Sequence, residues 1–256
     1  MHLNHRLCAF AVVAVGVLAR GAGAYAAEHE QHWSYSGATG PADWGKLEPQ
    51  YRACSVGKTQ SPIDIRDDRV AASGLSPIEF DYRPSPLKLI DNGHTIQVNV
   101  DRGSSITVNG RHYELVQFHF HKPSEEALNG AHFAMVAHLV HKDEQGKLAV
   151  VAVLLTKGDS NALLRTLWDH LPQTKNQEVA VPDVRIDASE LLPRDRSYYT
   201  FEGSLTTPPC SEGVRWFVLR HPLSISAGQI ARFAQLYPMN ARPLQPLNGR
   251  EIGAGG

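Results

Sequence analysis

Apolar and polar residues alternate over short stretches along most of the chain. This period of two is typical of β-strands, in which successive side chains point to opposite faces of a sheet. Asn109 and Gly110 separate two such stretches, and this dipeptide is a strong signal for a tight hairpin turn. The alternation predicts a turn leading into a short strand at 60–65, and strands at 78–82, 87–90, 95–100, 105–108, 113–121, 132–141 and 148–156.

Two other segments have their apolar residues at helical spacing. Residues 161–171 carry leucines and a tryptophan three or four positions apart, and residues 227–236 follow Ser226, a residue type favoured at helix N-termini. Residues 28–44 are polar and aromatic without a clear period, which predicts an ordered arm packed over the core. The Gly-rich residues 253–256 are expected to form a frayed tail.

The predicted elements are mostly strands, so the fold class is mainly β (α+β), with short helices at the periphery. A chain of 256 residues without an internal repeat is within the range of one large domain of this class. Its formal net charge of -1 and the lack of a basic block give no electrostatic footprint for nucleic acid or an anionic membrane. The partner is therefore expected to be a small molecule.

Residues 1–26 have the pattern of a cleaved secretory signal peptide. A short basic start is followed by an apolar run at 7–19 and by small residues, with the cut expected after Ala26 or Ala27. A transmembrane anchor is the alternative, but the apolar run is shorter than the roughly 20 residues that a bilayer requires, and Arg20 breaks it. We expect a mature domain at residues 27–256 without a membrane span.

The signal peptide contains one of the three cysteines, which leaves Cys54 and Cys210 in the mature chain. An even number of cysteines in an oxidising compartment is typical of a disulfide. A disulfide across so long a loop would stabilise the fold by roughly 4 to 5 kcal/mol in the chain-entropy model. Two buried free thiols are the alternative.

The run Gln-Phe-His-Phe-His at residues 117–121 is a candidate for metal binding. Side chains alternate along a strand, so His119 and His121 share one face while the phenylalanines point to the other. Turn residues between 122 and 130 allow the next strand to return antiparallel, which can bring His138 beside the pair. Three neutral imidazoles with a vacant fourth position are typical of a catalytic zinc site. The chain has 13 histidines, so structural or surface histidines are the alternative for this run taken alone.

These histidines belong to a set of motifs that together resemble a known family. The motifs are Gln-Ser-Pro-Ile-Asp-Ile at 60–65, Asn-Gly-His at 92–94, Gln-Phe-His-Phe-His at 117–121, His-Leu-Val-His at 138–141 and Ser-Leu-Thr-Thr-Pro-Pro at 204–209. In this order and spacing they resemble an alpha-class carbonic anhydrase of the secreted bacterial type. The resemblance implies a mostly antiparallel twisted sheet of about ten strands, with zinc at the bottom of a conical cavity. It also implies a monomer or homodimer in the bacterial periplasm, inhibited by sulfonamides and small anions.

The activity that the resemblance implies is the reversible hydration of carbon dioxide to bicarbonate and a proton. Zinc held by His119, His121 and His138 would lower the pKa of a bound water to about 7, an effect for which carbonic anhydrases are themselves the standard example. The zinc-bound hydroxide would then attack carbon dioxide.

The resemblance also implies residues that handle protons around this nucleophile. Thr206 is expected to accept the hydrogen of the hydroxide and to pass its own hydrogen to Glu125, which orients the attacking lone pair. His94 matches the family's proton shuttle, and its ordinary pKa of about 6.5 suits a relay near neutral pH. A histidine that follows Asn-Gly is otherwise a surface turn residue.

Further positions match the family as supporting residues or as substrate contacts. Gln117 and the backbone of Asn240 match the hydrogen-bond partners of the first two ligands, and Cys54 with Cys210 matches a disulfide of secreted bacterial members. Apolar strand residues are core residues in most proteins, so ordinary packing is the alternative for the expected substrate pocket. The pocket positions are Val140, Val150, Leu205, Thr206, Thr207, Val214 and Trp216.

Two positions depart from the family pattern. Many members carry glutamate two residues before the third ligand, where this chain has Val136, and valine cannot accept a ring proton from His138. Water or another group would have to accept it, or zinc would be held less tightly. Glu126 stands where many members have histidine, behind the link from Thr206 to Glu125. The alternative functions of such a fold are a binding protein that has lost turnover and a zinc hydrolase acting on esters.

Overall fold

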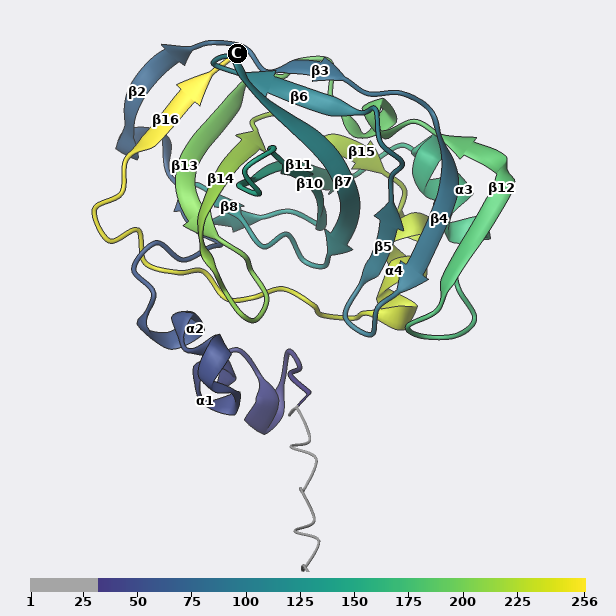
Figure 1. Ribbon diagram of the computed structural model, residues 1–256, viewed down its shortest axis with the longest axis horizontal. Coiled ribbons are helices and arrows are strands. Elements are labelled where there is room, and N and C mark those ends of the chain that lie inside the picture. The colour runs from purple at the N-terminus through teal and green to yellow at the C-terminus, as the bar shows by residue number, and fades with distance from the viewer. Residues whose placement is uncertain (1–31) are drawn as a thin grey trace, which may run out of the picture. The chain divides into compact units, whose positions relative to one another are not determined.

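The computed structural model describes residues 32–256, apart from the side chains of residues 72 and 73. This part of the chain forms one large twisted sheet of 13 strands and a small sheet of three (Figure 1). The main path of the large sheet runs β12-β4-β5-β7-β10-β11-β14-β13-β16-β2, and β3, β6 and β15 attach to it. The strands are β1 (Asp64–Ile65), β2 (Val70–Leu75), β3 (Glu79–Asp81), β4 (Ser85–Asp91), β5 (Ile96–Asn99), β6 (Ser105–Val108), β7 (Arg111–His121), β8 (Ala127–Leu128), β9 (Ala131–His132), β10 (Met135–Lys142), β11 (Leu148–Lys157), β12 (Glu178–Ile186), β13 (Tyr198–Ser204), β14 (Glu212–Leu219), β15 (Leu223–Ile225) and β16 (Ile252–Gly255).

Most neighbouring strands of the large sheet are antiparallel, as predicted. Parallel pairs occur where β11 meets β14 and β15, and where β16 meets β2, so the sheet as a whole is mixed. The predicted hairpin is present between β6 and β7. Asn109 and Gly110 have φ angles of 49° and 74°, the positive values that a tight turn between twisted strands requires.

Six strands of the large sheet were not predicted: β2, β12, β13, β14, β15 and β16. Pro182 lies inside β12, where the pairing with β4 shifts register between Val181 and Arg185, and proline normally argues against a strand. The expectation of a frayed tail at 253–256 was wrong, because β16 pairs with β13 on one side and with β2 on the other. Glycine weakens the sequence signal for a strand, but hydrogen bonds to two neighbouring strands stabilise β16 here.

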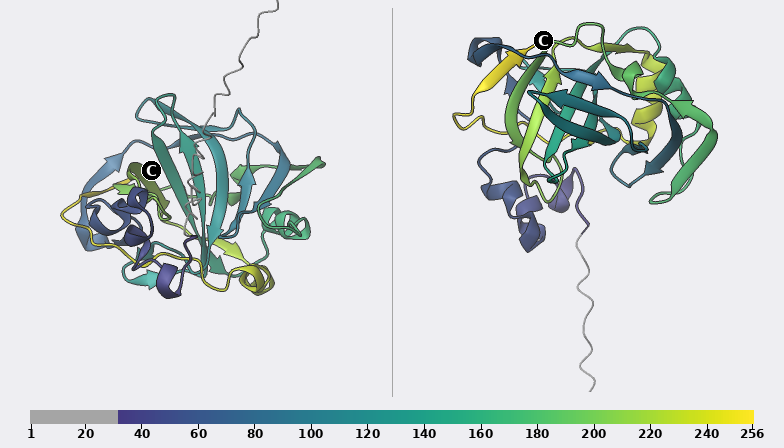
Figure 2. Two further views of the ribbon diagram at one scale, coloured as in Figure 1. Left: turned by 60° about the horizontal axis from the view of Figure 1, so that its bottom comes forward. Right: turned by 45° about the horizontal axis from the view of Figure 1, so that its top comes forward.

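Both predicted helices are present. Helix α3 (Ala162–Asp169) is capped by the side chain of Asn161, which accepts the backbone N–H of Leu164. Helix α4 (Ala227–Leu236) begins with a capping box between Ser226 and Gln229. The two helices lie next to each other on the side of the large sheet that carries β4, β5 and β12 (Figure 2).

Two short helices before β1 were not predicted. They are α1 (Trp44–Leu47) and α2 (Ala53–Val56). The described part of the expected arm begins at residue 32, and Trp44 at its end is fully buried with its ring N–H donated to the carbonyls of Ser34 and Thr39. The expected signal peptide and residues 28–31 of the expected arm lie outside the described residues. None of the helices in the described part of the chain is long and apolar enough to cross a membrane.

Alternation along β7 divides the core into two faces. Phe118 and Phe120 are fully buried on the helix face, which we define as the face that packs against α3 and α4. The ring of Phe120 lies 5.2 Å from that of Trp168 on α3 and 6.3 Å from that of Phe233 on α4. The opposite face, the histidine face, carries the side chains of His119 and His121. The helix face thus anchors β7 and fixes the direction of its histidines.

Candidate active site

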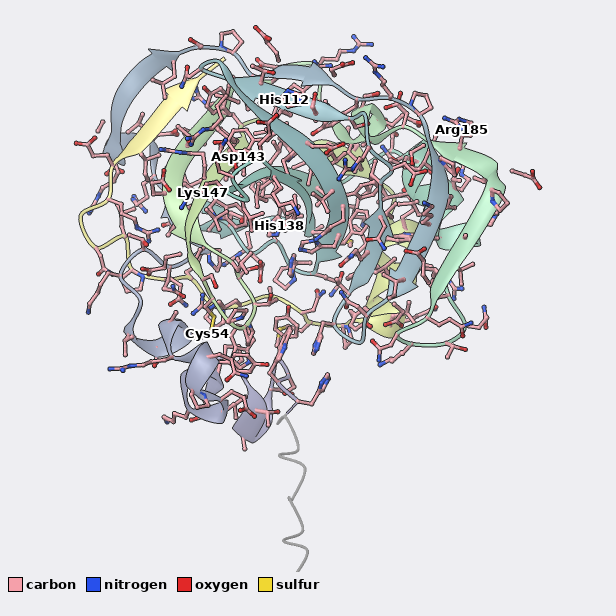
Figure 3. All side chains as sticks on the ribbon, viewed as in Figure 1. Cys54, His112, His138, Asp143, Lys147 and Arg185 are labelled. Atoms are coloured by element: carbon pink, nitrogen blue, oxygen red, sulfur yellow. A yellow bond between two sulfur atoms is a disulfide. The ribbon has the colours of Figure 1, made fainter. Side chains whose placement is uncertain are left out.

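Three histidines meet on the histidine face of two adjacent strands. His119 and His121 belong to β7, and His138 lies directly opposite His119 on the antiparallel strand β10. One ring nitrogen from each of the three lies within 4.8 Å of the other two, an arrangement that can hold a metal ion. Figure 3 labels His138 in the central part of the sheet. The structure therefore brings together the three candidate ligands named from the sequence.

Each imidazole donates one ring N–H to a fixed acceptor. His119 donates from Nδ1 to the Gln117 side-chain oxygen at 2.8 Å, and His121 donates from Nδ1 to the Asn240 backbone carbonyl at 2.7 Å. His138 instead uses Nε2, which lies 3.1 and 3.2 Å from the two carboxylate oxygens of Glu126. These bonds leave Nε2 of His119, Nε2 of His121 and Nδ1 of His138 for a shared ion. The Nε2 atom of His121 is buried without a hydrogen-bond partner among the described residues, which fits a metal ligand.

Burial sets the protonation of the first two histidines. It lowers the pKa of His119 to about 3, with a smaller contribution from His138, and it lowers the pKa of His121 well below the ordinary value. Both rings are therefore neutral near pH 7, which is the form that binds a metal. Burial also acts to lower the pKa of His138, but the carboxylates of Glu126 and Glu125 outweigh it and raise this pKa.

Glu125 is a second fully buried carboxyl group at the site. Burial raises its pKa to about 7 and the charge of Glu126 adds to this, while His138, the Arg242 backbone N–H and the Thr206 hydroxyl act in the opposite direction. The Oε1 atom of Glu125 accepts the Arg242 N–H at 2.7 Å. A carboxyl group fixed in this way can orient the Thr206 hydroxyl.

Thr206 and Thr207 lie in the loop between β13 and β14. The Leu205 N–H donates to the Ser211 carbonyl at 3.0 Å, which closes the loop at its base. The loop is tied to α2 by a disulfide between Cys54 and Cys210, as predicted; Figure 3 labels Cys54 at this bridge. A covalent bond therefore anchors the segment that presents Thr206 to the site.

An apolar cluster adjoins the three histidines. The expected pocket residues Val150, Val214 and Trp216 are buried in this cluster, and Val140 and Leu205 are partly buried against it. The Trp216 ring meets the His138 ring edge-on, with the ring centroids 4.9 Å apart. These side chains form a packed core, and the same cluster also provides an apolar wall beside the imidazoles.

His94 lies at the turn between β4 and β5. The Asn92 side-chain oxygen accepts the backbone N–H groups of His94 and Thr95 at 3.0 and 2.9 Å, which fixes the turn. His94 lines a cavity of about 130 Å³ together with both β7 histidines and Thr207. Its ring stacks on Trp33 with the centroids 3.6 Å apart and the planes at 6°. Burial lowers the pKa of His94 to about 4, helped by the charges of His32 and Lys175.

Comparisons with known proteins point to one family. Residues 39–255 match the model of the family described as eukaryotic-type carbonic anhydrase. The chain belongs to the alpha carbonic anhydrase family. A carbonic anhydrase of Klebsiella pneumoniae is 46% identical to it over 224 residues, which cover 86% of this chain and 90% of the relative. A carbonic anhydrase of Nostoc sp. is 43% identical over 224 residues, which cover 86% and 85% of the two chains.

Solved structures of alpha carbonic anhydrases have the same fold. The enzyme of Thermovibrio ammonificans, determined in complex with the inhibitor sulfanilamide, matches with a TM-score of 0.83 and 43% identity, covering 86% of this chain and 98% of that one. The resemblance found in the motifs is therefore confirmed at the level of family and fold.

Two contacts at this alpha carbonic anhydrase site were not predicted. Because Val136 stands in place of the usual glutamate, the sequence left the ring N–H of His138 without an identified acceptor. In the structure this N–H donates to Glu126. The sequence did mark Glu126 as unusual, but a contact between side chains 12 positions apart depends on how the intervening segment folds. The stacking of Trp33 on His94 was missed because the arm has no periodicity that would place its side chains.

Proposed function

We propose that the protein binds Zn²⁺ through His119, His121 and His138 and catalyses the reversible hydration of carbon dioxide to bicarbonate and a proton. The observation that carries this proposal is the convergence of three ring nitrogens whose imidazoles are each oriented by a separate hydrogen bond. A nitrogen-only donor set of this kind, with few other ligands at hand, suits zinc. Zinc, when bound, supplies a hydroxide nucleophile near neutral pH, an effect for which carbonic anhydrases are the standard example.

Thr206 and Glu125 would orient the nucleophile. A Thr206 hydroxyl that donates to Glu125 has only its lone pairs left, so it can accept a hydrogen but cannot donate one to the site. Ligands without a hydrogen to donate are thereby disfavoured, and an attacking hydroxide is held in one orientation. Substitution of Thr206 by valine keeps the shape and removes the acceptor, so this variant is expected to lower kcat/KM while the zinc content stays at one per chain.

Carbon dioxide is uncharged and linear, so it needs apolar surface near the nucleophile. The cluster that contains Val150, Val214 and Trp216 offers such a surface next to His138. Weak binding suffices, because strong binding of the ground state would not increase turnover.

His94 is proposed to carry the proton out of the cavity. In the stacked position its pKa of about 4 is too low to hold a proton near pH 7. We therefore expect the ring to leave Trp33 whenever it carries a proton. His94→Ala is expected to slow turnover at low buffer concentration, and added imidazole should restore it. An unchanged rate at low buffer would refute this assignment.

We also propose that residues 1–26 are removed as a signal peptide and that the mature enzyme, residues 27–256, acts in a bacterial periplasm as a monomer or homodimer. The disulfide between Cys54 and Cys210 supports an oxidising compartment. Mass spectrometry of protein recovered from a periplasmic extract would locate the new N-terminus. A mature chain that retains residue 1 would contradict this proposal.

The experiment that tests the central proposal is stopped-flow carbon dioxide hydration by the purified protein, with zinc counted per chain and an aromatic sulfonamide as inhibitor. We expect one zinc per chain and rapid turnover that the sulfonamide blocks. Zinc without turnover would favour the binding protein. Faster turnover of an activated ester than of carbon dioxide would favour the hydrolase.

A further inference from the structure

The carboxylate of Glu126 contacts the third histidine of the site on the side away from the other two. Both groups are buried, with exposed fractions of 0% for Glu126 and 1% for His138. The two carboxylate oxygens lie almost equally far from Nε2, at 3.1 and 3.2 Å. Within residues 32–256, this ring N–H is the one hydrogen-bond donor that the carboxylate has. A buried carboxylate without any hydrogen-bond donor is costly. This contact therefore strongly favours the form of His138 that carries a proton on Nε2.

Strand β10, which carries His138, has no side chain next to His138 that can accept the ring N–H. Val136 lies two residues earlier on the same face of β10, and it is fully buried in the apolar cluster with Ile63 and Ile65. Its methyl groups accept no hydrogen bond. The ring N–H of His138 therefore depends on a side chain from another segment, the one that joins β7 to β10.

Hydrogen bonds fix the backbone of that segment at Glu126. The Ser124 hydroxyl donates to the Glu126 backbone carbonyl at 2.7 Å and accepts the Phe133 N–H at 2.8 Å. The ring of His132 donates to the Ser124 carbonyl at 2.8 Å. These bonds connect the backbone of Glu126 to residues just before β10. The carboxylate is thus aimed at His138 by a fixed backbone.

The three imidazoles differ in the charge of their partners. His119 donates to a neutral side-chain amide and His121 donates to a neutral backbone carbonyl. His138 alone among the three donates to a carboxylate. A charged acceptor makes the stronger hydrogen bond and gives its imidazole more electron density for a metal.

We propose that Glu126 is the positioning residue of His138. It keeps the proton on Nε2, so that the lone pair of Nδ1 faces the metal site, and its charge makes His138 the strongest of the three ligands. This inference rests on the zinc site of the proposed function. It follows that Glu126 slows the release of zinc.

The test measures zinc release from the loaded protein into excess chelator. Two variants are compared with wild type: Glu126→Gln keeps an acceptor of the same shape without the charge, and Glu126→Ala removes both. We expect release to be about 10-fold faster for the first and up to about 100-fold faster for the second, because substitutions of such partners lower metal affinity by about 10- to 100-fold in metal enzymes, carbonic anhydrases among them. Release within twofold of wild type for both variants would overturn the inference.

A matched control is Asp143→Asn. Asp143 is also a buried carboxylate, but it follows the end of β10, five residues after His138, which is roughly 16 Å of extended chain. Figure 3 labels both residues. Its side chain accepts the backbone N–H groups of Gln145 and Lys147. We expect this variant to release zinc as wild type does. Equal acceleration in the control would show a general effect of losing a buried charge and would overturn the specific role of Glu126.

A second measurement separates positioning from a merely structural role. Nitrogen-15 NMR of the histidine rings in the zinc-free protein reports which nitrogen of His138 carries the proton. Wild type and Glu126→Gln should show the proton on Nε2, and Glu126→Ala should show a mixture. If Glu126→Ala does not fold, Glu126→Gln decides through its release rate. A ring of His138 that keeps its Nε2 proton in folded Glu126→Ala would overturn the tautomer role.

Failure of the inference and failure of the proposed function give different results. Wild type that turns over carbon dioxide, together with Glu126 variants that keep zinc, would refute the inference alone. Wild type that binds zinc without turnover, together with variants that lose zinc, would refute the proposed function alone.

Discussion

Replacement of Trp33 by alanine should raise the pKa of His94. Two opposing effects act on this imidazole. Burial disfavours its charged form, whereas the face of the Trp33 ring, 3.6 Å away and nearly parallel, attracts a cation. Burial is the largest of the effects that lower the pKa of His94 from the ordinary 6.5 to about 4. Trp33→Ala removes the burial on one side of the ring and the attraction together.

The size of the change follows from what remains around the ring. Attraction to an aromatic face is worth about 0.5 to 1 kcal/mol at a partly exposed site, which is less than about one pKa unit. The ring of His32, with its centroid 4.8 Å away, and the charge of Lys175 stay in place and continue to lower the pKa. We therefore expect a rise of about one to two units, which leaves the pKa somewhat below 6.5.

The assay is an NMR titration of the histidine ring protons, with His94→Ala used to assign the resonance. Trp33→Phe is the matched control, because it keeps an aromatic ring over His94 and should give a smaller rise. A higher pKa should also speed proton export at low buffer concentration near neutral pH. A pKa in Trp33→Ala equal to or below that of wild type would refute the reasoning, since it would mean that the aromatic attraction exceeds the cost of burial.

Three further predictions concern packing and the substrate wall. A methyl group on Gly203 would collide with Ser61 and lie 2.7 Å from the Trp216 ring, so Gly203→Ala should lower the free energy of unfolding by about 1 to 3 kcal/mol in urea denaturation; an unchanged midpoint would contradict this. Replacement of both disulfide cysteines by serine should cost about 5 kcal/mol for a separation of 156 residues, and a loss below about 1 kcal/mol would show that the loop-closure argument fails. Val150→Trp should fill the apolar wall and lower kcat/KM roughly 100-fold with zinc retained, and normal turnover would place carbon dioxide elsewhere.

The arrangement of the three histidines could be predicted from the sequence because it depends on short-range rules. Alternation puts His119 and His121 on one face, and turn residues after β7 allow an antiparallel return that pairs His138 with His119. The hairpin at Asn109 and Gly110 follows from the same kind of rule, since the dipeptide tolerates positive φ angles.

The contacts that could not be predicted are those between segments whose relative position only the whole fold determines. Glu126 contacts His138 because hydrogen bonds of Ser124 to Phe133 and His132 fold the connecting segment back. No pattern of apolar residues encodes that path. The departures at positions 126 and 136 were visible in the sequence, but their relation to each other required the geometry.

Strands β12 and β16 were missed for a different reason. β12 contains a proline and β16 is rich in glycine, and both residue types are rare in strands. Their pairing partners hold them in place, so tertiary structure overrides local preference there.

The place of β16 between β13 and β2 sets an order in which the protein can be completed during translation. β2 is synthesised long before β16, yet in the large sheet its neighbour is β16, so early in synthesis β2 has no strand to pair with. A ribosome synthesises a chain slowly enough for its earlier parts to begin folding. The strands from β4 to β14 can therefore associate first. The edge of β2 stays unpaired until residues 252–255 have left the ribosome. A released chain truncated after residue 251 should remain open to proteolysis near β2 even though its histidine site can form.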